Sequence, residues 1–467
     1  MLQSSAVAED RDDRTAEERA FVVPKGRLRR TLPLAGATAR TVAGGAARWV
    51  RMRGMGDDER SARELEFHAR HAARYAELLG DMKGAMMKVG QLLSFVDSAD
   101  LVPEPYREVY RTALAQLQAD APPMPPDLVA EIVEAELGER PDVAFDWFSP
   151  LPLAAASIGQ VHAAHLRDGR EVAVKVQYPG VAEAIEADLR NGELLAQVLK
   201  LGQSMLGPLA PKVDARAVAD EVRDRVGEEL DYRTELANQQ LFYDLYREHP
   251  TIRIPYLVPE RSAARVLTME LVDGMRWAAA IEAPRELRDQ WGAVIACFVY
   301  GSLYTYGVFN ADPHPGNYLF HEDGSVTFLD FGCIKRFEPQ QVEHMKVLER
   351  AVLRDDPELL RSAFVALGFL GEEAPPADEL MAWYRPLYEP VLAPQPATYT
   401  HEYAAASVRR HFDPLGPSGK LIRRFDLPRD FMFLGRIVVG LNSVLAGLGA
   451  TADWRAIADE VREASPA

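Results

Sequence analysis

A short stretch of strand-like sequence between long helical patterns most constrains how this chain folds. The residues SIGQVHAAHLRDGREVAVKVQYPG (157–180) predict two antiparallel strands joined at Asp168-Gly169, a dipeptide typical of hairpin turns. In the second strand, EVAVKVQY, valines occupy one face, and Lys175 shares the other face with Ala173. Two interpretations fit a lysine in so apolar a strand. It either lies at a sheet edge and faces solvent, or it is held in the strand to bind the phosphates of a nucleotide.

The rest of the chain has a mostly helical pattern. Helices are predicted from about 58 to 118 and again in DLVAEIVEAELG, where Gly138 ends the helix. Short strands are expected near 252–258 and 264–271, and helices dominate from about 285 onward. A chain of 467 residues exceeds what one hydrophobic core usually supports, so we expect more than one lobe. This order of elements predicts an α+β fold with a small β-rich lobe followed by a helical lobe.

The composition limits the classes of protein that fit. A formal net charge of −17 argues against a nucleic-acid partner, because general nucleic-acid binders are normally basic. Cys297 and Cys333 are too few for a disulfide framework, which favours a reducing, cytoplasmic location. The most apolar run, FMFLGRIVVGLNSVLAGLGA (431–450), is interrupted by Arg436 and Asn442 and therefore predicts a buried C-terminal helix.

Basic residues gather near the start of the sequence. From Lys25 to Arg53 there are eight basic residues and no acidic one, with Leu, Val and Trp side chains between them. One interpretation is a basic amphipathic segment that contacts an anionic bilayer, which would make the protein peripheral at the inner membrane surface. The other is a solvated, disordered arm, and the sequence fits both.

Two acids and an amide are predicted to meet at the mouth of a second hairpin. The segment NYLFHEDGSVTFLDFG (317–332) predicts two short antiparallel strands, and their pairing would bring Asn317 beside Asp330. Asp312 lies a few residues upstream, in FNADPHPGNYLF. Such oxygen ligands suit Mg²⁺, which completes its shell with phosphate oxygens. The alternative is a loop capped by Asx turns, and zinc is disfavoured because His314 has no His or Cys companions at ligand spacing.

An acid-rich segment, RDRVGEELDYRTELANQ (223–239), predicts a helix that supplies a partner for the strand lysine. On an ideal helix Glu228, Asp231 and Glu235 share one face, and Glu229 points elsewhere. The spacing alone does not select which acid pairs with the lysine. A solvated acidic face is the alternative.

A helix with two internal glycines is predicted in DMKGAMMKVGQLLS (81–94). Gly84 and Gly90 each cost about 1 kcal/mol relative to alanine inside a helix. With Lys88 and Gln91 beside them, the glycines fit either close approach to a polar site or ordinary helix packing.

Together these segments resemble the AarF/UbiB family of atypical, protein-kinase-like proteins, from about residue 80 to 335 and more weakly to about 450. KGAMMKVGQLLS is similar to the family's Lys-x-Gly-Gln helix, LAAASIGQVHAA to its alanine-rich counterpart of the kinase glycine-rich loop, and VAVKVQYPGV to its strand-lysine segment. ELDYRTELAN is similar to the Glu-x-Asp helix, and ADPHPGN and LDFG resemble the catalytic and metal-binding motifs.

The resemblance implies a bilobal, protein-kinase-like fold with an added N-terminal helical segment, and ATP and Mg²⁺ as cofactors. Four divisions are expected: a disordered or basic amphipathic arm (1–57), a helical extension with the Lys-x-Gly-Gln segment (58–126), the β-rich N-lobe (127–273) and the helical C-lobe (274–460).

The resemblance also assigns a role to the residues that match each motif. Lys175 would hold the α- and β-phosphates of ATP with Glu235 as its helix partner, and Asp312 would be the catalytic aspartate. Asn317 and Asp330 would bind Mg²⁺. The implied nucleotide contacts are Ala154, Ala155, Ala156, Ser157, Ile158, Gly159, Val161, Ala173, Met269, Glu270 and Leu271. The polar cluster across the active site would comprise Lys88, Gln91, Glu229 and Asp231.

The activity that the resemblance implies is ATP hydrolysis, or phosphorylation of a small molecule or lipid in ubiquinone or other isoprenoid-lipid metabolism. An isoprenoid lipid or quinone precursor is the expected partner. No His-Arg pair precedes Asp312, Asn310 stands where the family often has His, and no Ala-Pro-Glu segment follows LDFG. These departures argue against peptide-substrate binding. Two alternatives stay open: a nucleotide-binding scaffold without turnover and, with less support, a true protein kinase.

Overall fold

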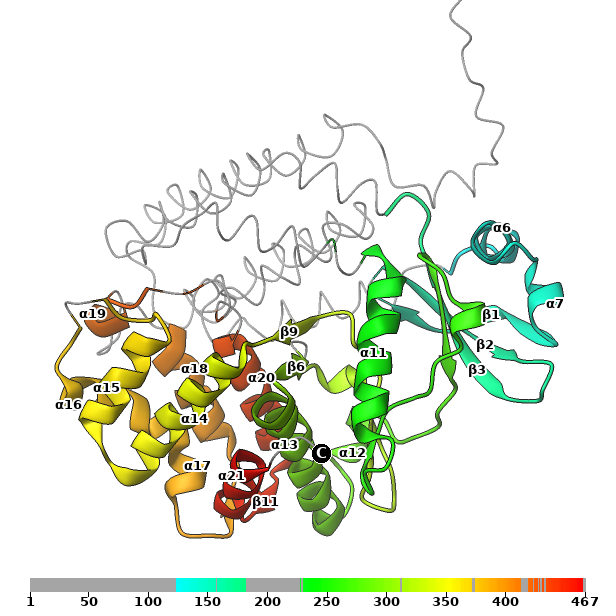
Figure 1. Cartoon of the computed structure of the whole chain (residues 1–467). Coiled ribbons are helices and arrows are strands. Elements are labelled where there is room, and N and C mark those ends of the chain that lie inside the picture. Colours follow the sequence, from blue (N-terminus) through cyan, green and yellow to red (C-terminus); the bar gives the residue numbers. More distant parts are fainter. Residues whose placement is uncertain are drawn as a thin grey trace, which may run out of the picture.

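A four-stranded sheet followed by a mainly helical region forms the part of the chain that the structure describes (Figure 1). The structure is a computed structural model, and it describes residues 123–156, 158–181, 227, 230–310, 313–371, 374–412, 419–422, 424–426, 428, 431 and 434–464. The order of the two parts is the α+β order that the sequence predicts. The basic stretch 25–53 and the helical extension 58–118 lie outside the described residues.

The sheet is antiparallel, with the strand order β1-β2-β3-β5. Its strands are β1 (Trp147–Ala156), β2 (Gly159–His165), β3 (Glu171–Gln177) and β5 (Val266–Glu270). The hairpin predicted around Asp168-Gly169 is confirmed, and Gly169 has the positive φ of 87° that such a turn favours.

The structure corrects one part of the sequence analysis at this sheet. The small residues LAAA, which the resemblance assigns to the alanine-rich counterpart of the kinase glycine-rich loop, belong to the strand β1 and not to a loop. Ala154 pairs with Val161, and Ala156 pairs with Gly159, so the strands run almost to their connection. Pairing with β2 gives the backbone of β1 hydrogen-bond partners that a loop would lack. These hydrogen bonds outweigh the weak preference of alanine for strands.

Helices cover the two faces of this sheet. On one face, α6 (Pro126–Leu137) packs buried apolar residues against the valines of β3, and Gly138 ends the helix in the left-handed conformation, as predicted. On the other face lies α11 (Tyr232–Tyr246), whose Tyr232 packs with Ala173 and Met269. The remaining short helices of this lobe are α7 (Pro141–Ala144) and η2 (Pro259–Arg261).

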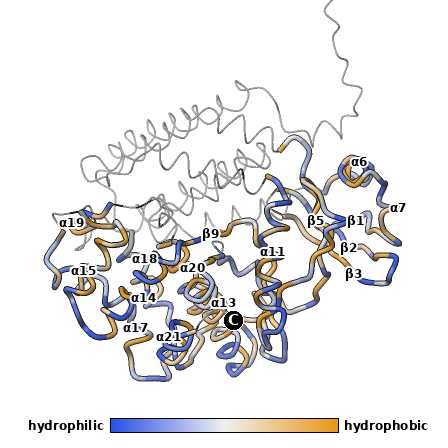
Figure 2. Tube along the Cα trace, viewed as in Figure 1, coloured by the Kyte–Doolittle hydropathy of each residue, from blue (hydrophilic) through white to orange (hydrophobic). Residues whose placement is uncertain are grey.

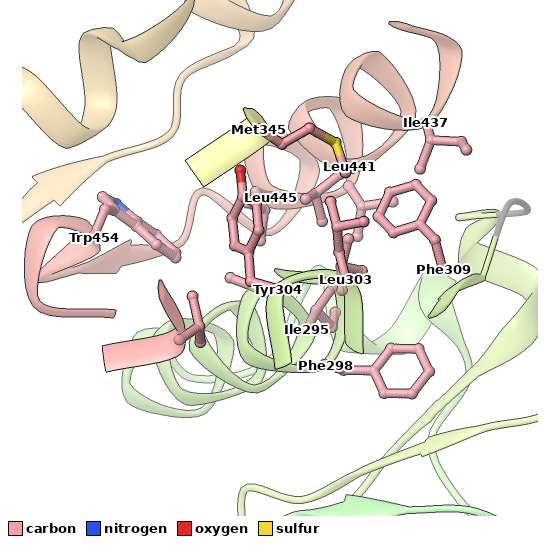
Figure 3. Packing of buried hydrophobic residues seen from close by; sticks show 14 of the residues in the cluster. Ile295, Phe298, Leu303, Tyr304, Phe309, Met345, Ile437, Leu441, Leu445 and Trp454 are labelled. Atoms are coloured by element: carbon pink, nitrogen blue, oxygen red, sulfur yellow. The ribbon is translucent and has the colours of Figure 1, made fainter. Parts of the chain in front are cut away.

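The second lobe is arranged around the long helix α13 (Arg285–Tyr306). Figure 3 shows residues of α13, such as Ile295 and Leu303, packed among residues of neighbouring elements, including Leu441 and Leu445 of α20. The other helices are α12 (Trp277–Ala280), α14 (Pro339–Arg354), α15 (Pro357–Ala366), α16 (Ala377–Tyr384), η4 (Arg385–Tyr388), α17 (Glu389–Leu392), α18 (His401–Phe412), α19 (Gly419–Ile422), α20 (Leu434–Leu448) and α21 (Trp454–Glu463).

Short strands between the helices hold the loop segments in place. They are β4 (Ile252–Arg253), β6 (Val308–Asn310), β7 (Tyr318–Phe320), β8 (Val326–Phe328), β9 (Ile334–Arg336), β10 (Ala397–Thr398) and β11 (Thr451–Ala452). β7 and β8 form the predicted second hairpin, and β6 pairs with β9. An isolated bridge between Met275 and Phe320 attaches the segment that joins the lobes to β7.

The apolar C-terminal run forms a buried helix, as predicted. Ile437, Leu441 and Leu445 of α20 are at most 2% exposed and belong to the core of the helical lobe.

Figure 2 shows the alternation of hydrophobic and hydrophilic residues along the chain, with hydrophobic stretches on α13 and α20 and a hydrophilic turn between β2 and β3. No helix within the described residues is long and apolar enough to cross a membrane.

Candidate functional site

Lys175 of β3 and Glu235 of α11 form a buried ion pair between the sheet and the helix. The Nζ atom of Lys175 donates to Oε1 of Glu235 at 2.9 Å and to Oε2 at 2.8 Å. The two side chains are only 12% and 4% exposed. Burial by itself lowers the pKa of Lys175, but the charges of Glu235 and Asp330 raise it above its ordinary value. The lysine therefore remains a cation although little water reaches it.

Asp231 does not continue the helix that carries Glu235, contrary to the sequence analysis. Its backbone is extended (φ −119°, ψ 104°), α11 begins at the next residue, and its carboxylate accepts a hydrogen bond from the N–H of Arg233 at 3.0 Å. Aspartate is strongly preferred at the N-cap of a helix, because its carboxylate accepts a hydrogen bond from an N–H group that has no partner within the helix. A structural role therefore accounts for Asp231, and its place in a polar cluster with Glu229 stays a prediction.

The strand register brings most of the predicted nucleotide contacts to the face that carries the lysine. Val161 pairs with Lys175 and with Ala154, so these three residues lie in one row across the sheet. Ala173 pairs with Met269 two residues further along the same face. Ala155 pairs instead with Gln160, whose partner is Val176, and its side chain is therefore on the opposite face. Only the backbone of Ala155 is available to a ligand on the lysine side.

Some of the predicted site residues lie at the two ends of this sheet. Ile158 is buried at the connection of β1 and β2, and its carbonyl accepts a hydrogen bond from Tyr178. β5 ends at Glu270, and Leu271 follows it where the chain leaves for the helical lobe. The N–H of Leu271 donates to the carbonyl of Glu171 at 3.1 Å. The predicted residues that lie outside the described part of the chain are Lys88, Gln91, Ser157, Glu229 and Asp312.

Gly159 is required by the neighbouring strand. A Cβ atom at this position would lie 2.3 Å from the carbonyl oxygen of Val176 and 3.0 Å from the Cα atom of Gln177. The family resemblance implies that Gly159 is one of the nucleotide contacts. The contact with β3 explains it without a ligand.

We expect Gly159→Ala to destabilise the N-lobe by about 1–3 kcal/mol, because the new methyl group must displace the backbone of β3. The measurement is urea denaturation of the full chain. Gly371→Ala is the matched control, since a Cβ atom there meets nothing within 4 Å, and it should change stability by less than about 0.5 kcal/mol. Equal stability of the two variants would contradict this account of Gly159.

A buried chain of hydrogen bonds holds the β1–β2 hairpin and was not foreseen from the sequence. His162 Nδ1 lies 2.8 Å from the carbonyl oxygen of Ser149, and His162 Nε2 lies 2.8 Å from Gln160 Nε2. Gln160 Oε1 accepts from the N–H of Met124 at 2.9 Å. Burial lowers the pKa of His162, so the ring is neutral, with its proton on Nδ1 facing the carbonyl. The pairing irregularity of β1 after Phe148 leaves that carbonyl for the side chain.

Asn317 and Asp330 lie at the mouth of the β7–β8 hairpin. The N–H of Leu329 donates to the carbonyl of Asn317 at 3.0 Å, which places Asp330 one residue beyond this pairing. Asp330 Oδ1 accepts from the N–H of Gly332 at 2.9 Å. The Asx turn that the sequence left as an alternative to a metal site is therefore present in Asp330. It orients one carboxylate oxygen and does not by itself exclude a cation at the other.

His314 belongs to a local turn. Its Nδ1 accepts from the N–H of Gly316 at 3.1 Å, and it precedes the short helix η3 (Pro315–Asn317). Among the described residues, which do not include Asp312, there is no group of three or more His, Cys, Asp or Glu side chains that would hold a metal ion.

Two asparagines that the sequence analysis did not assign to the site hold the LDFG loop. Asn238 Nδ2 donates to the carbonyl of Phe331 at 3.1 Å, and Asn310 Nδ2 donates to the carbonyl of Asp330 at 2.8 Å. Phe331 also packs on Phe242 of α11, with ring centroids 5.0 Å apart. Asn238 lies three residues after Glu235, so helical spacing was the available signal. α11, the helix that carries Glu235, is therefore hydrogen-bonded to the loop that carries Asp330.

A strand lysine paired with a helix glutamate, next to a loop with magnesium-type ligands, is the arrangement of the protein-kinase class. The sequence model of the ABC1 atypical kinase-like domain matches residues 116–363, more than half of the chain. The chain therefore belongs to the ABC1, or AarF, family of atypical kinase-like proteins, and the resemblance found in its motifs is confirmed.

Several known proteins are similar to this chain. A chloroplastic aarF domain-containing protein kinase of Arabidopsis thaliana is 31% identical over 411 residues, which are 85% of this chain and 55% of the relative. The mitochondrial atypical kinase COQ8 of Saccharomyces cerevisiae is 32% identical over 284 residues, 60% of this chain and 54% of the relative. The chain thus spans about half the length of the curated relatives it matches.

A solved structure supports the fold assignment. Rv3197 of Mycobacterium tuberculosis, determined in complex with erythromycin, matches with a TM-score of 0.60 and 31% sequence identity. The match covers 87% of this chain and 98% of the other. The kinase-like α+β fold expected from the sequence is therefore confirmed, and a fold of this kind implies nucleotide binding.

Proposed function

We propose that this protein is an Mg²⁺-dependent ATPase or phosphotransferase of the atypical kinase type. The observation that carries the proposal is the buried Lys175–Glu235 ion pair with the charge of Asp330 nearby. Two apolar residues of similar volume would usually serve stability as well as a buried ion pair does. Phosphoryl transfer, in contrast, needs a fixed cation at the phosphates, and a glutamate keeps the lysine in place.

The proposed roles follow from where the side chains lie. Lys175 Nζ would bind the α- and β-phosphates, and Glu235 holds the ammonium group through both carboxylate oxygens. The face formed by Ala154, Val161 and Ala173 would cover the nucleotide, with Met269 at the end toward the helical lobe. Small and apolar side chains are the usual lining of a site for a flat aromatic base.

The donor set at the hairpin mouth fits Mg²⁺. Asp330 offers a carboxylate and Asn317 an amide oxygen, and both are hard ligands. When bound, Mg²⁺ neutralises phosphate charge and holds the nucleotide in a reactive geometry. Asp312, from its position in the motif, is proposed to accept the proton of the attacking hydroxyl or water. Asn238 and Asn310 hold the backbone on which Asp330 is carried.

The proposed acceptor is a small molecule or lipid rather than a peptide, in ubiquinone or other isoprenoid-lipid metabolism. The missing His-Arg pair and Ala-Pro-Glu segment support this choice over a protein kinase. The names of the relatives place them in chloroplasts and mitochondria. For this chain we propose a cytoplasmic location, with contact to the inner membrane surface through the basic stretch 25–53.

ATP turnover measured against a panel of prenylated quinone precursors, with and without anionic liposomes, tests the proposal. We expect Mg²⁺-dependent phosphate release that rises in the presence of one precursor class or of the liposomes. A nucleotide-binding scaffold would bind ATP and show no turnover under any of these conditions. Phosphorylation of an added protein without any lipid requirement would instead favour a protein kinase.

A further inference from the structure

The last long helix of the chain touches the loop that carries the proposed catalytic groups. Gly440 of α20 faces the ring of Pro313, which directly follows Asp312 in the sequence. A Cβ atom on Gly440 would lie 2.7 Å from Cγ of Pro313, 3.7 Å from its Cβ and 3.8 Å from its Cδ. Carbon atoms that are not bonded approach to about 3.5–4.0 Å. Only glycine therefore allows the helix backbone to meet this ring.

The segment before Asp312 also packs against α20. Phe309 of β6 is 1% exposed and lies in the same core cluster as Ile437 and Leu441. Figure 3 shows the ring of Phe309 directed toward these two residues. The loop is thus supported by one helix on both sides of the proposed catalytic aspartate. This helix, α20, begins at Leu434, beyond the residues 116–363 that match the kinase-like domain.

We infer that α20 positions the catalytic loop, and that Gly440 is the positioning residue that sets where Pro313 lies. The inference rests on the proposed function for its catalytic consequence. A glycine inside a helix is less favourable than alanine by about 1 kcal/mol, and the contact with Pro313 gives a reason for it. Displacement of a reacting group by about 1 Å lowers rates by as much as about 100-fold. A side chain at position 440 would therefore lower kcat by displacing the loop, without touching the substrate itself.

The test compares two glycines of the same helix. Gly440→Ala and Gly440→Leu place a side chain against Pro313. Gly447→Ala is the matched control, because its Cβ atom would lie 2.6 Å from Cζ2 of Trp277 on α12, whose ring contacts Phe320 at the end of β7 and not Pro313. All three changes increase helix propensity. The readouts are kcat, the Kd for Mg²⁺–ATP, and amide hydrogen exchange at Gly316, Asn317 and Tyr318.

We expect Gly440→Ala to lower kcat by about tenfold and Gly440→Leu by about 100-fold, with little change in the Kd for ATP. Exchange should become faster at the amides of Gly316, Asn317 and Tyr318 in these variants. In Gly447→Ala the change in exchange should be confined to residues around Trp277. Pro313→Ala, which removes the Cγ atom, should recover part of the kcat that Gly440→Ala loses, a coupling expected of residues in direct contact.

Two results would overturn the inference. One is unchanged exchange at the loop in both Gly440 variants, and the other is the same pattern of exchange in Gly440→Ala and Gly447→Ala. If the unmodified protein turns over no ATP, the catalytic part of the proposed function fails. The exchange measurement still decides the inference, because it requires no activity.

Discussion

Asp330→Asn is expected to reduce ATP turnover by at least about 10²–10³-fold, the range seen when a single charge-stabilising group is removed from an active site. The substitution keeps an oxygen that accepts from the N–H of Gly332, so the turn after Asp330 is retained. It removes the negative charge that Mg²⁺ requires. Phosphate release from Mg²⁺–ATP is the measurement, and the rise in melting temperature on adding Mg²⁺–ATP should also shrink.

Asp323→Asn provides the matched control for this change. Asp323 lies in the turn at the other end of the same hairpin, and its side chain is about half exposed. Its carboxylate pairs with Arg253 and accepts a hydrogen bond from the N–H of Ser325. It should leave turnover close to that of the unmodified protein. Unchanged turnover in Asp330→Asn would contradict the role proposed for this carboxylate.

Because Lys175 and Glu235 form a buried pair, we expect that replacing both residues restores stability and does not restore activity. Glu235→Leu leaves a buried ammonium group, and Lys175→Met leaves a buried carboxylate. Each single change should therefore destabilise the protein by about 3–5 kcal/mol. The double variant removes both charges and fills the space with apolar atoms, and the methionine packs near the ring of Tyr232, where the lysine lies now. Its stability should return to within about 1–2 kcal/mol of the unmodified protein.

Turnover is expected to fail in all three variants, because none of them presents a correctly held cation to the phosphates. Chemical denaturation gives the stabilities, and phosphate release gives the activity. A double variant as unstable as the single ones would contradict the assignment of the lost stability to an unpaired buried charge. Activity in the double variant would contradict the role of Lys175.

Much of the N-lobe follows from local sequence. The alternation of EVAVKVQY and the Asp168-Gly169 turn are local signals, and the structure confirms the strands they predict. The end of α6 at Gly138 is predicted for the same reason, and so is the second hairpin, which lies in the helical lobe. The extension of β1 to Ala156 was missed because the pairing with β2, rather than the preference of alanine, determines it.

The helical spacing of the acidic residues did not predict which of them pairs with Lys175. Periodicity left several acids open, since a helix presents the same residues whichever way it packs. The break at Asp231 and the packing of Tyr232 on the sheet decide that Glu235 meets the lysine. The contact between Gly440 and Pro313 joins positions 127 residues apart, the difference between their numbers, and no local pattern indicates it. Such a contact exists only once the helices and loops of the helical lobe are packed together.

The dependence of ATP affinity on Mg²⁺, measured by calorimetry, tests the central claim most directly. The claim is that Lys175 and Asp330 form one nucleotide site, with the lysine acting on the phosphates and the aspartate acting through the cation. We predict that Mg²⁺ tightens ATP binding by about tenfold or more in the unmodified protein, equivalent to about 1.4 kcal/mol, and has little effect in Asp330→Asn. Equal affinity with and without Mg²⁺ in the unmodified protein, or the same Mg²⁺ effect in both proteins, would contradict the account.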